Sequence, residues 1–118
     1  IVCGIISNAD ERYGDSILPM LGVTHDDLKF QCFSKDLGVE KPNPLIYAGA
    51  MERATPFLVN AKEEPMDPSC VLHIGNDFNK DFEGARSFGQ HAVLLDRYDE
   101  VDLASEWRRR GAPVFTDL

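Results

Sequence analysis

The amino-acid sequence predicts an α/β fold built on a parallel sheet with helices on both faces. Two observations indicate this fold class. Short apolar runs alternate with longer segments of helical pattern along all 118 residues. Polar side chains also follow several of the apolar runs at the point where each run ends. In open parallel sheets, ligands bind beyond the carboxyl ends of the strands, so this placement predicts a functional edge.

Each element has its own local signal. Residues 1–6 form a nearly continuous apolar run, as expected for a strand that is buried on both faces. Pro42 and Pro44 predict the start of a helix, while Gly22 and Gly89 predict helix ends. The expected strands span residues 1–6, 30–33, 70–74, 91–95 and 113–115, the expected helices span 11–21, 45–55, 77–88 and 103–110, and residues 59–69 are expected to form a loop.

Composition narrows the classes of partner and compartment. A net charge of −8 and a pI near 4.7 argue against a nucleic-acid partner. The sequence contains no apolar run of membrane-spanning length, so no membrane partner is expected. Cys3, Cys32 and Cys70 are odd in number and lie mostly in apolar runs, which predicts buried free thiols in a reducing, cytoplasmic compartment.

A hydroxyl and a cation form the first part of a candidate phosphate site. Ser7 ends the first predicted strand, and Lys41 follows the second one. The hydroxyl of Ser7 and the side chain of Asn8 could donate hydrogen bonds to a phosphoryl oxygen, and Lys41 could neutralise its charge. A turn cap at Ser7 and a surface role for Lys41 are the alternatives.

An acidic turn forms the second part of the candidate site. Asp77 lies at a strand-to-helix junction, and Asp81 follows one helical turn later on the same face. Carboxylate and amide oxygens suit Mg²⁺, so Asp77, Asp81 and Asn76 are the candidate metal ligands. Alternatively, the two carboxylates only stabilise the helix N-terminus. His73 lies within an apolar strand and is expected to be a core histidine.

Three segments together resemble motifs of the haloacid dehalogenase-like (HAD) hydrolases. The resemblance covers essentially the whole chain, and the residues around Lys41 and His73 resemble eukaryotic members most. One departure is Asn76, which stands where the family often has aspartate. The matching segments are Ile5-Ile6-Ser7-Asn8, Lys41-Pro42-Asn43-Pro44 and Gly75-Asn76-Asp77 through Asp81-Phe82-Glu83-Gly84-Ala85.

The resemblance implies a Rossmann-like three-layer core in which an Asp-x-Asp motif on an earlier strand supplies the nucleophile. The sequence begins inside the strand that ends at Ser7, so we expect residues 1–118 to form one partial HAD core domain. This domain would lack the first central strand, the cap and thus the N-terminal part of its own fold. Two central strand edges would then lack partners.

The function implied by the resemblance is that of a magnesium-dependent phosphatase. The parent enzyme would act on a small phosphorylated metabolite through an aspartyl-phosphate, and this chain alone would be inactive. Two alternatives remain open, namely a non-catalytic HAD-like interaction module and a hydrolase of the haloacid dehalogenase type.

Overall fold

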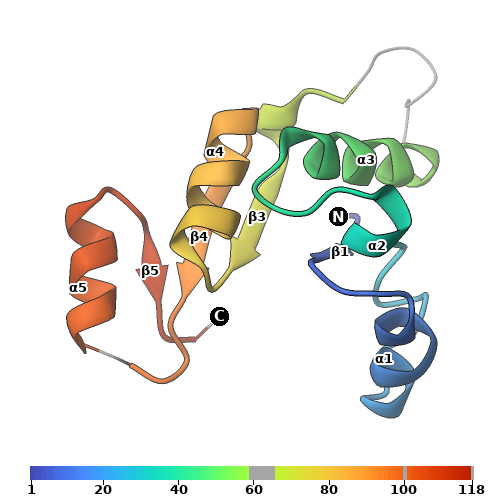
Figure 1. Ribbon diagram of the computed structural model, residues 1–118, viewed down its shortest axis with the longest axis horizontal. Coiled ribbons are helices and arrows are strands. Elements are labelled where there is room, and N and C mark those ends of the chain that lie inside the picture. Colours follow the sequence, from blue (N-terminus) through green and yellow to red (C-terminus); the bar gives the residue numbers. More distant parts are fainter. Residues whose placement is uncertain (59–65, 100, 118) are drawn as a thin grey trace. The chain divides into compact units, whose positions relative to one another are not determined.

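The strands in the described part of this protein form two parallel sheets (Figure 1). The structure is a computed structural model that describes residues 1–58, 66–99 and 101–117. It divides into two compact units, residues Ile1–Met66 (unit 1) and Asp67–Leu118 (unit 2). Each unit carries one of the sheets and the helices packed on it, and each is described by itself below.

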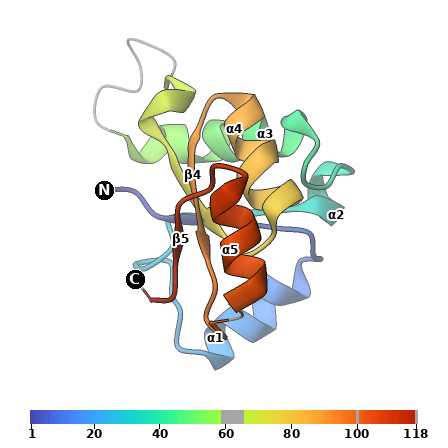
Figure 2. The same ribbon diagram turned by 90° about the vertical axis from the view of Figure 1, so that its left-hand side faces the viewer.

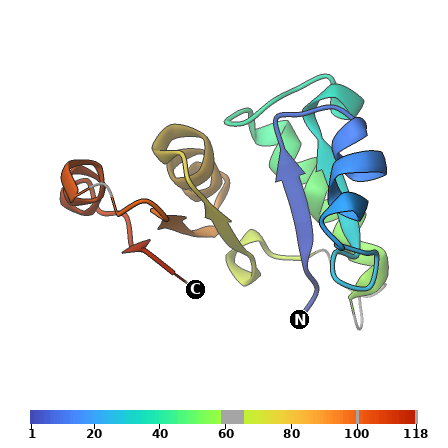
Figure 3. The same cartoon turned by 90° about the horizontal axis from the view of Figure 1, so that it is seen from below.

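Unit 1 is a two-stranded parallel sheet with one main helix. β1 (Gly4–Ser7) pairs with β2 (Phe30–Phe33), so that Ser7 lies opposite Phe33. The connection contains the π-helix η1 (Tyr13–Ile17) and the short helix α1 (Leu18–Met20). After β2 come α2 (Ser34–Leu37), α3 (Pro44–Ala54) and the 3-10 helix η2 (Thr55–Phe57). α3 packs against both strands (Figure 3).

The start of α3 follows from its sequence. The side chain of Asn43 accepts a hydrogen bond of 3.0 Å from the N–H of Leu45, and Pro44 occupies the first helical position. Ile46, Tyr47, Ala50 and Ala54 share one face of the helix and are buried with Cys32 and Phe33 of β2. The apolar stripe of α3 therefore forms the core of unit 1.

Unit 2 is a three-stranded parallel sheet in the order β3-β4-β5. Its register places Gly75 opposite Leu94 and Leu95 opposite Phe115. In chain order the elements are η3 (Pro68–Cys70), β3 (Leu72–Gly75), the π-helix η4 (Phe78–Glu83), α4 (Gly84–Phe88), β4 (His91–Leu95), α5 (Val101–Arg109) and β5 (Val114–Phe115).

The core of unit 2 lies between the sheet and the helices η4 and α5. Trp107 is 7% exposed and packs α5 against the sheet. Figure 2 shows α5 beside β4 and β5. The guanidinium of Arg110 lies 3.8 Å from the centre of the Phe78 ring and ties the end of α5 to η4. The buried cluster consists of Phe78, Leu94, Ala104, Trp107, Ala112 and Val114.

The predicted positions of most elements are confirmed within a few residues. Within the predicted helix at 11–21, the structure has the π-helix η1 and one turn of α1. The four-residue helix α2 was not predicted, because its Ser-Lys-Asp-Leu sequence is too short to show a helical period. Of the loop predicted at 59–69, residues 59–65 lie outside the described residues, and the 3-10 helix η3 begins at Pro68.

The prediction that all three cysteines are buried was wrong for two of them. Cys32 has no exposed surface, whereas Cys3 and Cys70 are exposed. The reason is their position, since Cys3 precedes β1 and Cys70 ends η3, so that neither belongs to a strand ladder. Burial raises the pKa of the Cys32 thiol, which disfavours the thiolate.

The parallel direction of the strands is confirmed in both sheets. Within the described part of the chain, β1 pairs with β2 alone and β3 with β4 alone. β1 and β3 therefore each lie at an edge of their sheet. In the same described ranges, no helix combines the length and the apolar character needed to cross a bilayer.

We predict that Ile46→Ala lowers the free energy of unfolding by about 2–5 kcal/mol, since it leaves a cavity under α3. Ile46 has no exposed surface, whereas its neighbour Leu45 is 62% exposed. Leu45→Ala is therefore the matched control and should change stability by less than about 0.5 kcal/mol. Urea unfolding followed by circular dichroism measures both variants. Equal losses for the two would contradict this assignment of the core.

Candidate functional site

The carboxyl end of β1 is held close to the loop that carries Lys41. Ser7 is the last residue of β1, and Asn8 follows it directly. The Oδ1 atom of Asn8 accepts a hydrogen bond of 2.8 Å from the N–H of Lys41, and Nδ2 donates one of 3.2 Å to the carbonyl oxygen of Lys41. Ser7 and Lys41, predicted as partners from positions 34 residues apart (41 − 7), thus belong to segments that contact each other in unit 1.

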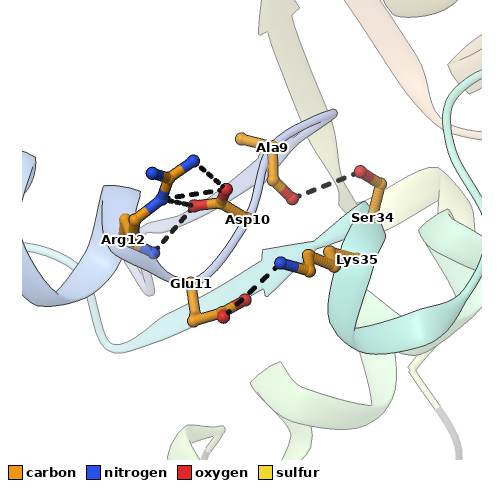
Figure 4. Close-up of polar contacts among 6 residues, drawn as sticks. All are labelled: Ala9, Asp10, Glu11, Arg12, Ser34 and Lys35. Carbon is orange, nitrogen blue, oxygen red and sulfur yellow. Dashed lines mark hydrogen bonds and ion pairs between the residues drawn. The ribbon is translucent and has the colours of Figure 1, made fainter.

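The loop after β1 is also fixed on its other side (Figure 4). The carbonyl oxygen of Ala9 accepts hydrogen bonds from the hydroxyl of Ser34 at 3.3 Å and from the N–H of Lys35 at 3.2 Å. The ammonium of Lys35 lies 3.8 Å from a carboxylate oxygen of Glu11. The chain that follows Ser7 is therefore anchored to the start of α2.

Arg12 neutralises the acidic side chain in this loop. Its guanidinium donates to both carboxylate oxygens of Asp10, at distances of 2.7 to 3.1 Å. These hydrogen bonds hold the pKa of Asp10 below its usual value. Because the positive charge of Arg12 lies beside Asp10, the negative charge of this carboxylate repels an anion near Ser7 less strongly.

Lys41 lies in a short loop that leads into α3. Gly38 ends α2 with a φ of 71°, a left-handed conformation that glycine adopts without strain. The N–H of Asn43 then donates to the carbonyl oxygen of Glu40 at 2.8 Å, directly before the cap of α3. Lys41 itself is half-buried. Its loop therefore has a defined backbone between two helices.

In unit 2 the acidic turn connects β3 to η4. Asp77 caps η4, since its Oδ1 atom accepts a hydrogen bond of 2.8 Å from the N–H of Lys80. Asp77 is half-buried and the preceding Asn76 is exposed. The two residues that offer hard oxygen atoms therefore stand next to each other at the carboxyl end of β3.

Asp81 is buried beneath this turn, with 3% of its surface exposed. Its Oδ2 atom accepts hydrogen bonds of 3.0 Å from the N–H groups of both Asn76 and Asp77. Its Oδ1 atom lies 2.9 Å from Nε2 of His73, which is 9% exposed. The carboxylate of Asp81 thus joins the strand, the turn and the helix.

Gly75 provides the space for this arrangement. A Cβ atom added at position 75 would lie 2.1 to 2.3 Å from the side chain of Asp81, closer than any real contact. The carboxylate therefore passes directly over the backbone of Gly75. Glycine is required here for close approach and not for an unusual φ angle.

The structure thus groups the predicted residues in two sets, Ser7, Asn8 and Lys41 in unit 1 and Asn76, Asp77 and Asp81 in unit 2. The prediction of a buried His73 is confirmed. Sequence reasoning missed the partner of His73, although Asp81 could have been found as the polar residue one turn into the following helix. It also missed the contact of Asn8 with the backbone of Lys41.

The acidic turn offers few oxygen atoms to a metal ion. Across residues 1–58, 66–99 and 101–117, no group of three or more His, Cys, Asp or Glu side chains has a geometry that could hold a metal. Magnesium, however, is commonly bound by one or two carboxylates together with water and phosphate oxygens. The oxygen atoms of Asn76 and Asp77 fit that smaller ligand set.

The chain is similar in sequence to several HAD-like hydrolases. A protein of Schizosaccharomyces pombe that is named a putative uncharacterized hydrolase is 36% identical over 95 residues. Haloacid dehalogenase-like hydrolase domain-containing protein 3 of Danio rerio is 35% identical over 97 residues. These alignments cover 80% and 81% of the chain but 39% and 35% of the relatives. The chain therefore spans little more than a third of the length of these relatives. No family model matches it.

Solved structures of this family share the fold. A HAD phosphatase of Thermococcus onnurineus matches with a TM-score of 0.67 and 22% identity, over 95% of the chain and 51% of that protein. The protein YfnB of Bacillus subtilis, named a putative HAD hydrolase and solved with bound magnesium, matches with a TM-score of 0.72 and 16% identity, over 100% of the chain and 45% of that protein. These likenesses identify the α/β fold as part of the HAD fold.

We predict that His73→Phe lowers the free energy of unfolding by about 1–3 kcal/mol, because it leaves a buried oxygen of Asp81 without its donor. His91→Phe is the matched control, since His91 is exposed and pairs in register with the residue before His73. It should change stability by less than about 0.5 kcal/mol. Urea unfolding checks both variants.

His73→Gln tests whether another hydrogen-bond donor to Asp81 can replace His73. The amide nitrogen of glutamine can donate to Asp81 from nearly the same place as Nε2 of histidine. We expect it to recover part of the lost stability. A glutamine variant as unstable as the phenylalanine variant would show that packing of the ring, and not the hydrogen bond, is what matters.

Proposed function

Since this chain belongs to the HAD-like hydrolase superfamily, we propose that it forms part of a magnesium-dependent phosphohydrolase. Its substrate class is a small phosphorylated metabolite, by analogy with the phosphatase of the same fold. The observation that carries the proposal is the pair of hydrogen bonds between Asn8 and Lys41. This contact joins the residue after Ser7 to the loop that carries Lys41. A hydroxyl and a cation on neighbouring segments are suited to a phosphoryl group.

Ser7 and Lys41 form the anion-binding part of the proposed site. The hydroxyl of Ser7 donates a hydrogen bond to a phosphoryl oxygen. The ammonium of Lys41 stabilises the negative charge that develops on the oxygens around phosphorus during transfer. Both groups act by electrostatic stabilisation, and neither forms a covalent bond to phosphorus.

Asp77 and Asn76 form the metal-binding part of the proposed site. When bound, Mg²⁺ neutralises charge on the phosphoryl oxygens. Asp77 contributes a carboxylate oxygen and Asn76 a neutral carbonyl oxygen. Asp81 acts indirectly, through a water molecule or by keeping the turn in shape, because both of its oxygens already accept hydrogen bonds.

The nucleophile is proposed to be an aspartate outside these 118 residues. Its carboxylate attacks phosphorus, the bond from phosphorus to the leaving oxygen breaks, and the leaving group departs as an alcohol after gaining a proton. Water then attacks the aspartyl-phosphate and releases orthophosphate and the free carboxylate.

We predict that Mg²⁺ shifts the backbone amide resonances of Asn76 and Asp77 in the 118-residue chain, and that Asp77→Asn raises the Kd for Mg²⁺ about tenfold or more. Asparagine caps helices as well as aspartate does, so this change removes charge without removing the cap. Nuclear magnetic resonance titration with magnesium chloride gives the Kd. Unchanged affinity in the Asp77 variant would contradict the metal assignment.

Asp67→Asn is the matched control for this titration. Asp67 caps η3 in the same unit, and its carboxylate accepts a hydrogen bond from the N–H of Ser69 at 2.9 Å. It should leave the affinity for Mg²⁺ unchanged. The unmodified chain should also fail to hydrolyse p-nitrophenyl phosphate. Magnesium-dependent turnover by the chain alone would refute the proposed location of the nucleophile.

A further inference from the structure

We propose that Asn8 is a positioning residue, whose carboxamide fixes the backbone of Lys41 and thereby aims the ammonium, and that it does not itself bind phosphate. This inference rests on the proposed function, in which Lys41 stabilises a phosphoryl group. It assigns Asn8 a different role from the one that its place after Ser7 suggests in the sequence.

The hydrogen bonds of Asn8 have a defined direction. The carbonyl oxygen of its side chain faces an N–H, and its amide nitrogen faces a carbonyl oxygen. The opposite orientation of the amide would place donor against donor and acceptor against acceptor. Asn8 therefore bonds Lys41 as a neighbouring strand would, through both polar groups of a single residue's backbone.

The side chain of Asn8 gives Lys41 the backbone hydrogen bonds that strand pairing does not supply at this position. Lys41 lies in the loop between α2 and α3, beyond the end of β2, so the strand pairing of unit 1 does not reach it. Asn8 satisfies both the N–H and the carbonyl oxygen of Lys41, which would otherwise need other partners. Ala9, the next residue, is anchored to α2 by two hydrogen bonds. The backbone of Lys41 is thus held by a segment that is itself fixed to β1 and α2.

The side chain of Asn8 has little capacity left for a ligand. One hydrogen of Nδ2 and one lone pair of Oδ1 serve Lys41, which leaves a second hydrogen on Nδ2 as its one further donor. A phosphate contact would have to use that hydrogen. The two roles can therefore be separated by experiment, because a positioning residue acts only while the side chain that it positions is present.

The test is a double-mutant cycle with Asn8→Ala, Lys41→Ala and the combined variant. The probe is inorganic phosphate in the presence of magnesium chloride, titrated into the 118-residue chain. We expect Asn8→Ala alone to raise the Kd for phosphate about three- to tenfold, since a loosened loop spreads the ammonium over more positions. In the Lys41→Ala background the same change should alter the Kd less than twofold. Additive effects would overturn the positioning role.

A measurement on the unmodified chain does not depend on how the variants fold. The hydrogen bond from Lys41 to Asn8 should give a scalar coupling between the amide nitrogen of Lys41 and the side-chain carbonyl carbon of Asn8, without phosphate present. Absence of this coupling would also overturn the inference. Glu52→Ala serves as the control variant, because Glu52 is exposed on α3 in unit 1, and it should leave the Kd unchanged.

The failure of this inference differs from the failure of the proposed function. A chain that does not bind phosphate would overturn the proposed function and, with it, the role of Asn8. A chain that binds phosphate, but in which the effects of Asn8 and Lys41 add independently, would overturn the positioning role alone.

Discussion

A carboxylate removed from water must find hydrogen-bond donors, and the acidic turn of unit 2 depends on how Asp81 meets this requirement. Asp81 is 3% exposed, and its donors include the ring of His73 and the backbone N–H groups of Asn76 and Asp77. The ladder of β3 ends at Gly75, so these two amides lie just where strand pairing stops. The buried side chain of Asp81 therefore fixes the turn at the end of β3. The positions of the side-chain oxygen atoms of Asn76 and Asp77 depend on this turn.

In unit 1 a neutral side chain, that of Asn8, fixes the backbone beyond the end of a strand. Lys41 lies beyond the strands, and Asn8 supplies the two hydrogen bonds that a neighbouring strand would otherwise give. In both units a polar side chain that the sequence suggests as a ligand holds the backbone of another candidate residue. Charged partners suit a fully buried position only when every oxygen is satisfied, whereas a carboxamide can do the same work at a half-buried position without the cost of desolvating a charge.

The sequence predicted the elements well where the pattern was local. Residues 30–33 and 91–95 form strands as expected, and the Asn43-Pro44 cap starts α3 within one residue of its predicted start. Patterns alone could not predict which side chains use their hydrogen-bonding capacity within the protein. Asn8 and Lys41 are 33 residues apart, and nothing in either local sequence indicates the other. The prediction of burial was wrong for Cys3 and Cys70 for a related reason, since an apolar neighbourhood in the sequence does not show where a strand ladder begins.

Gly75 limits how this turn can vary. Even a methyl group at this position would overlap the side chain of Asp81. Any larger residue at 75 would have to be accompanied by a shorter one at 81, and that exchange would also remove the partner of His73 and the acceptor of two amides. A larger residue at position 75 is therefore compatible with this turn only if position 81 changes with it. A change at position 75 thus has consequences for the hydrogen bonds of both His73 and the turn.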